Sequence, residues 1–148
     1  FIAHAPAGYL VSRTLRTRGQ AALIIGSVAP DLDLLRFYFI DNQHIHHHEY
    51  LTHRPILWAG IALAALVFWR FRAARLTVWL SVGALLHLVL DTFLGEINWS
   101  WPWGQFGGPL IVVPATQSHW ILSFVLHWTF LPEAEICAMA LWVYLRRR

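Results

Sequence analysis

A histidine and an aspartate lie four residues apart inside an otherwise apolar stretch of this sequence. His87 and Asp91, in the motif HLVLD, fall within LTVWLSVGALLHLVLDTFL, residues 76–94. Side chains at positions i and i+4 lie on one face of a helix, so the pair would present an imidazole nitrogen beside a carboxylate oxygen. Taken alone, the pair fits equally well a polar contact between packed helices or half of a metal site.

Two further carboxylates, Asp31 and Asp33, follow Pro30 in the motif PDLD. In a turn or extended geometry both could reach one cation, one of them directly and the other through water. The alternative is structural, with an aspartate capping the start of a helix at DLLRFYF. Both roles can coexist.

A histidine-rich segment, HIHHHEYLTHR at residues 44–54, is the strongest compositional signal for metal chemistry. Imidazole is the commonest metal ligand in proteins and it suits zinc. We interpret His44, His46 and His47 as incidental residues of a hydrated polar loop. His48 and His53 are the better ligand candidates, for the reason given with the family resemblance below.

Weaker candidates lie toward the two ends of the sequence. His4 is close to the start, where a solvated histidine is the alternative, and His127 and Glu133 flank the interruption at Pro132 in HWTFLPE. An ionisable group inside a membrane costs about 2.5–3.5 kcal/mol on insertion scales. A divalent cation bound by paired carboxylates would compensate for several such groups at once.

The sequence contains no nucleophilic-serine elbow, P-loop, GxGxxG motif or cysteine pair. Hydrolytic chemistry would therefore rely on metal-activated water, which suits displacement at phosphorus. The mixed His/Asp set predicts a divalent metal of the zinc type, one to three ions, with manganese as the alternative. Asp33 and Glu49 are the candidate catalytic bases.

The elements that must position these residues are predicted to be membrane-spanning helices. The chain of 148 residues is 57% hydrophobic and 13% charged, against about 25% charged in soluble domains. Four apolar stretches, at residues 20–40, 55–69, 76–94 and 119–145, are near the length of about 20 residues that spanning requires. We expect one all-α, multi-pass domain over residues 1–148, with about four spanning helices and an intramembrane His/Asp metal site.

Arginine clusters give this bundle an orientation. They lie at residues 13–18, 70–75 and 146–148 and are placed on the cytoplasmic side by the positive-inside bias. Loops 41–54 and 95–118 then share the opposite side, and the candidate ligands converge between mid-membrane and that face. The clusters are short and belong to no nucleic-acid-binding motif, so we expect no nucleic-acid partner.

The order of these motifs resembles the LexA-binding, inner membrane-associated hydrolase family, the YdjM-like proteins. The family pattern runs approximately P-D-x-D, H-R-G-x-T-H and H-x-x-x-D, followed by a Pro/Trp segment, and is matched here by PDLD, HEYLTH, HLVLD and WSWPW. The family's Arg and Gly are replaced by Glu49 and Tyr50, although Arg54 directly follows His53. The resemblance implies a membrane-bound metal-dependent hydrolase in the cytoplasmic (inner) membrane of a bacterium or archaeon.

The family in turn resembles, more distantly, the zinc-dependent phospholipase C and P1-nuclease group, whose H-x-x-x-D helix contributes metal ligands. That likeness implies two sets of roles. The expected ligands are Asp31, His53, His87 and Asp91, and the expected ligands or residues that support ligands are Asp33, His48 and His4.

Two functions follow from this reading of the sequence. The first is hydrolysis of a phosphoester in a lipid or lipid-linked substrate, with the bilayer and its lipids as partners. The alternative is a non-catalytic membrane protein whose metal site is structural or handles metal. A closed, fully protein-ligated site would favour a structural role, and an open coordination position would favour catalysis.

Overall fold

The computed structural model describes residues 2–42, 44–45, 47–105 and 107–146. Regular structure over these ranges is entirely helical, which confirms the predicted all-α class. The α-helices are α1 (His4–Thr14), α2 (Gln20–Gly26), α3 (Asp33–Phe39), α4 (Pro55–Val67), α5 (Arg72–Asp91), α6 (Trp120–Val125) and α7 (Phe130–Leu145). Three short 3-10 turns accompany them: η1 (Pro30–Leu32), η2 (His47–Glu49) and η3 (Leu51–His53).

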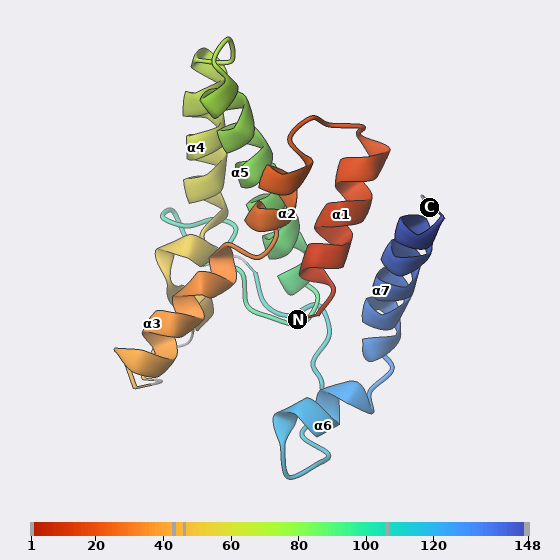
Figure 1. Ribbon diagram of the computed structural model, residues 1–148. Helices are drawn as coiled ribbons and strands as arrows, with labels where there is room; N and C mark the ends of the chain where they lie inside the picture. Colours follow the sequence, from red (N-terminus) through yellow and green to blue (C-terminus); the bar gives the residue numbers. More distant parts are fainter. Residues whose placement is uncertain (1, 43, 46, 106, 147–148) are drawn as a thin grey trace.

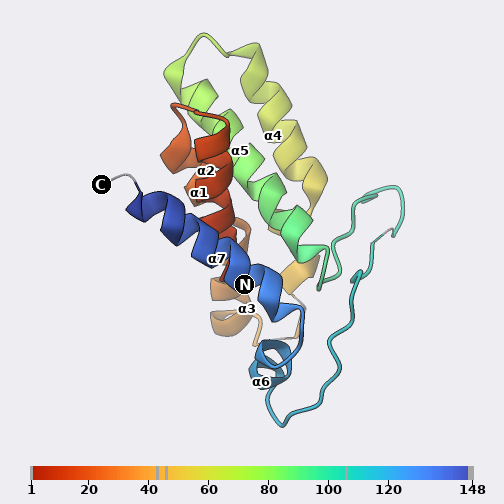
Figure 2. The same cartoon turned by 90° about the vertical axis from the view of Figure 1, so that its right-hand side faces the viewer.

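The centre of the fold is an antiparallel pair of helices, α4 and α5, with α2 packed against α5. Helix α1 contacts α2 on one side and α7 on the other, so the two ends of the chain lie in neighbouring helices (Figures 1 and 2). Helices α3 and α6 lie at the end of the molecule away from the α4–α5 turn (Figure 1).

The expectation of about four spanning helices is not supported. Among the described residues, only α5 is long and apolar enough to cross a membrane by length and composition. The apolar stretch 20–40 is divided into α2, η1 and α3, and α4 has 13 residues. The stretch 119–145 is divided between α6 and α7.

Local sequence explains these interruptions. Pro30 opens η1, because proline favours the first position of a helix and disfavours helical geometry in the residue before it. Pro132, the interruption noted in the stretch 119–145, does not lie in the middle of a helix. It lies instead in the first turn of α7, where its missing N–H is not needed for an intrahelical hydrogen bond.

The surface of this fold is strongly apolar. Large hydrophobic side chains are exposed on α3, α4 and α7, including Phe39 (79%), Val67 (79%) and Leu141 (57%). The buried hydrophobic cluster is small by contrast, and its members are Trp58, Ala84, Leu88 and Ile97. Contiguous apolar surface on this scale is typical of a membrane or interaction surface.

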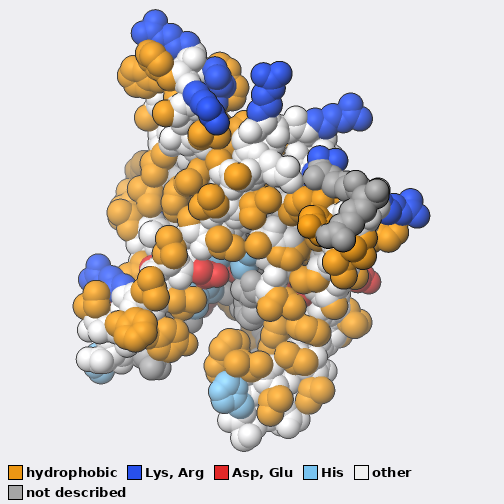
Figure 3. Space-filling view, in the orientation of Figure 1, with side chains coloured by type: hydrophobic (Ala, Val, Ile, Leu, Met, Phe, Trp, Pro, Cys, Tyr) orange, Lys and Arg blue, Asp and Glu red, His pale blue; other side chains and the backbone are white. Residues whose placement is uncertain are grey.

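Arginine side chains gather at one end of this apolar body, with one further basic group over α3 (Figure 3). That end carries the α1–α2 connection, the α4–α5 turn and the last turn of α7. The described parts of the three arginine clusters therefore lie together, as the sequence predicted.

Helices α2 and α5 approach each other unusually closely. A Cβ atom on Gly83 would clash with the backbone oxygen of Leu23, and one on Gly26 would clash with the backbone of Leu80. Only glycine allows two backbones to meet in this way. The contact brings the residue that follows α2, Ser27, against the last turns of α5, where His87 and Asp91 lie.

Candidate metal centre

Four predicted ligands from three separate elements meet at one point. His87 and Asp91 come from the last turns of α5, Asp31 from η1 and His53 from η3. One ligand atom from each of the four residues lies within 4.8 Å of all the others. Three of these side chains are buried, whereas the side chain of Asp31 is 29% exposed. Solvent therefore reaches the cluster on the side where Asp31 lies.

The two imidazoles present the same nitrogen to the same two carboxylates. His87 Nε2 lies 3.0 Å from Asp91 Oδ2 and 3.6 Å from Asp31 Oδ1. His53 Nε2 lies 3.6 Å from Asp91 Oδ2 and 4.0 Å from Asp31 Oδ1. Both nitrogens are buried, yet neither makes a hydrogen bond with any residue that the structure describes. Because buried polar atoms are nearly always satisfied, two such nitrogens beside two carboxylates form a group that could hold a cation.

The second nitrogen of each ring is held from behind. His53 Nδ1 donates to Asp33 Oδ2 at 2.7 Å, and His87 Nδ1 donates to the backbone oxygen of Ser27 at 2.9 Å. A carbonyl oxygen can only accept, so His87 carries its proton on Nδ1 and its lone pair on Nε2. Metal-binding histidines are typically oriented by a carboxylate or backbone carbonyl in this way. The donor set therefore fits a divalent cation, and two imidazoles with two carboxylates suit zinc.

Electrostatics around His53 lead to the same conclusion. Burial disfavours the imidazolium form, but the hydrogen bond to Asp33, the close approach of Asp91 and the negative charges of both residues outweigh it. The net effect raises the pKa of His53 to about 9. The carboxylates thus carry more negative charge than the neutral imidazoles balance, and a proton or a metal cation compensates for it.

Asp33 is placed differently from Asp31. Its Oδ2 accepts hydrogen bonds from His53 Nδ1 and from Thr52 Oγ1, and it is not among the grouped ligand atoms. The reason is local: Asp33 begins α3 immediately after η1, and residues two apart in helical geometry point in different directions. Asp33 therefore orients a predicted ligand and does not reach the same point as Asp31.

His4 and His48 extend the cluster on two sides of Asp91. His4 Nε2 lies 3.1 Å from Asp91 Oδ1, and the His4 ring stacks on His87 with centroids 4.0 Å apart. His48 Nε2 lies 3.6 Å from the other oxygen, Oδ2. The close approach of His48 depends on Gly95, because a Cβ atom at that position would overlap the imidazole ring.

Histidine 47 was interpreted as an incidental loop residue, yet it lies beside the centre. His47, His48 and His53 form a second group whose ligand atoms are within 4.8 Å of one another. The histidine-rich segment that contains it was the sequence signal. His44 is exposed, and His46 lies outside the described residues.

The remaining candidates lie apart from the grouped ligand atoms. His127 Nδ1 is 2.9 Å from Thr129 Oγ1, between α6 and α7. Glu133 Oε2 accepts a hydrogen bond from the backbone nitrogen of Ala3 at 3.2 Å. Glu49 is exposed at the rim of a polar pocket described next.

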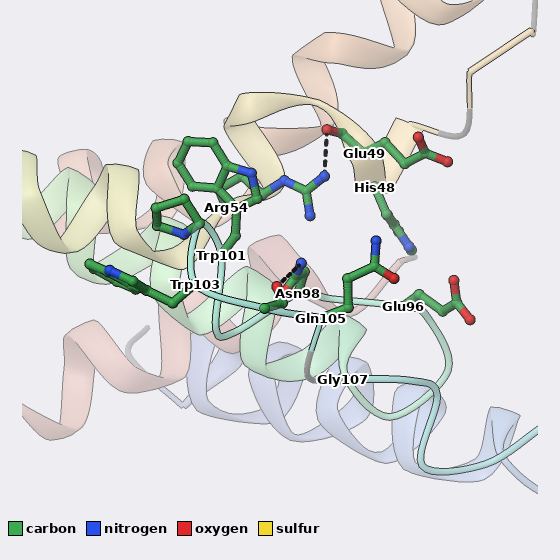
Figure 4. A pocket seen from close by; sticks show the side chains of 11 residues that line it. His48, Glu49, Arg54, Glu96, Asn98, Trp101, Trp103, Gln105 and Gly107 are labelled. Atoms are coloured by element: carbon green, nitrogen blue, oxygen red, sulfur yellow. Dashed lines mark hydrogen bonds between the residues drawn. The ribbon is translucent and has the colours of Figure 1, made fainter.

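Two pockets adjoin the cluster. The first, of 630 Å³, is lined by Asp31 and Asp91 together with His47, His48 and Glu96. The second, of 610 Å³, shares His48 and Glu96 with the first and is mainly polar. Its other polar residues include Glu49, Arg54, Asn98 and Gln105 (Figure 4).

The arrangement of the polar pocket separates charges. Arg54 Nη2 donates to the backbone oxygen of Glu49 at 2.9 Å, which holds the guanidinium near Trp101 (Figure 4). The carboxylates of Glu49 and Glu96 lie on the other side of the pocket, with His48 between them (Figure 4). A polar ligand in this pocket could therefore contact both a cationic and an anionic side chain next to the His/Asp cluster.

Residues 2–147 match the YdjM inner membrane protein family. No curated protein and no solved structure matches the chain.

Proposed function

The chain belongs to the YdjM inner membrane protein family, and we propose that it is a metal-dependent hydrolase that cleaves a phosphoester of a lipid or lipid-linked substrate. One observation carries the proposal. Two imidazoles and two carboxylates converge within 4.8 Å, and two of these four residues line an open pocket of 630 Å³. An accessible site supports catalysis, whereas a closed site would support a structural role.

The residues that would hold the metal are Asp31, His53, His87 and Asp91, with His4 and His48 available for further ions. When bound, a divalent metal supplies acidification of a water molecule and neutralisation of charge on a phosphoryl oxygen. Asp33 and the Ser27 carbonyl keep the two imidazoles oriented for binding.

Proton transfer is assigned to carboxylates at the pockets. Asp33 Oδ2 is already engaged by His53 and Thr52, so we assign it a positioning role. Glu49 is exposed in the polar pocket, and Glu96 lines both pockets. These two are the better candidates for the base that accepts a proton from attacking water.

A lipid phosphoester suits the depth of the site. Helix α5 has 20 residues and is about 30 Å long at 1.5 Å per residue, which matches the hydrocarbon core of a bilayer. His87 and Asp91 occupy its last turns, so in a spanning orientation they lie near one membrane face. Lipid phosphates lie at that depth, and Arg54 offers a guanidinium that can bind a phosphate oxygen.

Metal handling is the second candidate function. The group formed by His47, His48 and His53 shares His53 with the first cluster, and it begins three residues after the exposed His44. An ion could therefore be captured in the histidine-rich segment and passed inward without any hydrolysis.

The test is turnover on a panel of phospholipids by purified protein in mixed micelles, with and without a chelator and added zinc or manganese. We expect phosphoester cleavage that is lost in Asp31→Asn and His87→Gln, while His44→Gln, an exposed histidine outside the cluster, stays active. Cleavage that persists in His87→Gln and in chelator would contradict the proposal. Retained metal without turnover on any lipid would favour metal handling.

A further inference from the structure

An apolar groove lies beside the cluster, between the start of α1, the end of α5 and α7. Its volume is 370 Å³, within the range of small-molecule sites and too small for a docked helix of about 10–12 Å diameter. Its walls are formed mainly by Leu90, Phe93, Ile111, Trp128, Pro132 and Ile136. The groove is therefore shaped for a slender apolar ligand.

The groove and the other two pockets approach Asp91 from different sides. Asp91 Oδ1 faces His4, which lines the groove. Asp91 Oδ2 faces His48, which lines both of the other pockets. A ligand lying across this carboxylate would be apolar at one end and polar at the other.

The inner end of the groove contains an unsatisfied polar group. The His4 side chain is 3% exposed, and its Nδ1 makes no hydrogen bond with any described residue. Leaving a buried polar atom unpaired costs about 1–3 kcal/mol. A ligand that places a hydrogen-bonding group at this point would remove that cost.

The outer end of the groove is open and aromatic. Phe93 is 47% exposed and Trp128 is 57% exposed. Aromatic side chains of membrane proteins favour the interfacial region, where the acyl chains of lipids begin.

From these observations we propose that the groove binds one acyl chain of the lipid substrate, with the polar end of that chain at His4. The inference rests on the proposed function and deepens it, because it identifies the substrate as an acylated lipid. The phosphoester then lies at the His/Asp cluster, and the headgroup lies in the pocket that contains Arg54, Glu49 and Glu96.

The experiment uses two tryptophan substitutions at neighbouring positions of α5. Leu90→Trp fills the groove, whereas Val89→Trp places the same side chain at an exposed position that does not line it. Full-length protein is reconstituted in vesicles that contain phosphatidylethanolamine with a diazirine on its acyl chain. After irradiation, labelled peptides are mapped, and label on exposed Val67 of α4 serves as the internal standard.

The measured quantity is the label on peptides that contain Trp128–Ile136, divided by the label on the α4 standard. We expect this ratio to fall about tenfold in Leu90→Trp and to stay unchanged in Val89→Trp. Ile136→Trp, on α7, repeats the test if Leu90→Trp fails to fold. Groove peptides that are unlabelled in the parent protein, or equally labelled after filling, would overturn the inference.

The readout needs neither metal nor turnover, so failure of the inference and failure of the proposed function can be distinguished. Labelling that is lost on filling while the protein binds no metal supports the groove and contradicts the hydrolase. Where turnover exists, Leu90→Trp should lower kcat/KM for a long-chain phospholipid about tenfold more than it lowers kcat/KM for bis(p-nitrophenyl) phosphate. Equal losses on both substrates would contradict a role in acyl-chain binding.

Discussion

Nδ1 of His53 lies 2.7 Å from Oδ2 of Asp33, while Nε2 of the same ring faces Asp31 and Asp91. Of the two aspartates in the PDLD motif, Asp33 thus contacts Nδ1 of His53 and Asp31 lies near Nε2 of the same ring. The arrangement directs the Nε2 lone pair toward the point where the carboxylates converge. It is the part of the candidate centre that a proton or a metal ion should affect most.

Removing Asp33 should weaken metal binding without removing a ligand. In Asp33→Ala the His53 ring loses its partner, so we expect metal affinity to fall about 10–100-fold. Competition with a chromophoric chelator measures this change. Thr52→Val, which removes only the other hydrogen bond to Asp33, is the matched control. Its metal affinity should fall less than that of Asp33→Ala. Equal affinity in Asp33→Ala and the parent protein would show that Asp33 does not orient a ligand.

Metal affinity should rise with pH across the titration of His53. The pKa of His53 is raised from 6.5 to about 9 in the metal-free protein. Protonation of His53 therefore stabilises the folded, metal-free protein fully below pH 6.5, and this stabilisation is lost as the pH rises through about 9. A metal must displace the same proton. Apparent affinity should therefore increase by up to about tenfold per pH unit between these values. Isothermal titration at several pH values measures the slope, and a flat profile would contradict this coupling.

Gly95→Ala should disturb the centre through His48. The added Cβ would overlap the imidazole of His48 and move its Nε2 away from Asp91 Oδ2. We expect lower phospholipid turnover and an altered metal stoichiometry. Gly108→Ala, where a Cβ meets no atom within 4 Å, is the control in the same loop region. Parallel losses in both variants would point to a general effect on the loop.

Gly83→Ala should destabilise the packing of α2 on α5. The new methyl group would clash with the Leu23 carbonyl, and overpacking of this kind costs about 1–3 kcal/mol. The measurement is the thermal unfolding midpoint in detergent, with metal content recorded in parallel because Ser27, next to α2, orients His87. Gly60→Ala, in open space on α4, should stabilise its helix by about 0.5–1 kcal/mol instead. A midpoint unchanged by Gly83→Ala would contradict the tight packing.

Helical spacing was the most informative part of the sequence. The i, i+4 rule placed His87 and Asp91 on one face of a helix, and both indeed face the same point. The PDLD motif was informative for Asp31 but not for the role of Asp33. Two carboxylates in a short motif do not reveal that a 3-10 turn passes directly into a helix and turns Asp33 toward His53.

Hydropathy was less informative about helix ends. In the stretch 20–40 the break follows from Pro30, but in the stretch 119–145 composition alone does not place the break between Val125 and Phe130. Nor did the sequence reveal the contact of His4 with His87, because their approach depends on how α1 packs against its neighbours. Long-range packing of this kind has no periodic signature in a single sequence.

The most direct test of the account is metal analysis of the purified protein combined with X-ray absorption at the metal edge. We predict at least one equivalent of a divalent metal, with a first coordination sphere of nitrogen and oxygen atoms at about 2.0–2.2 Å, as expected for zinc with imidazole and carboxylate ligands. His87→Gln should lose this metal, and exposed His44→Gln should keep it. Less than one equivalent in the parent protein, unchanged by His87→Gln, would contradict a metal centre built from Asp31, His53, His87 and Asp91.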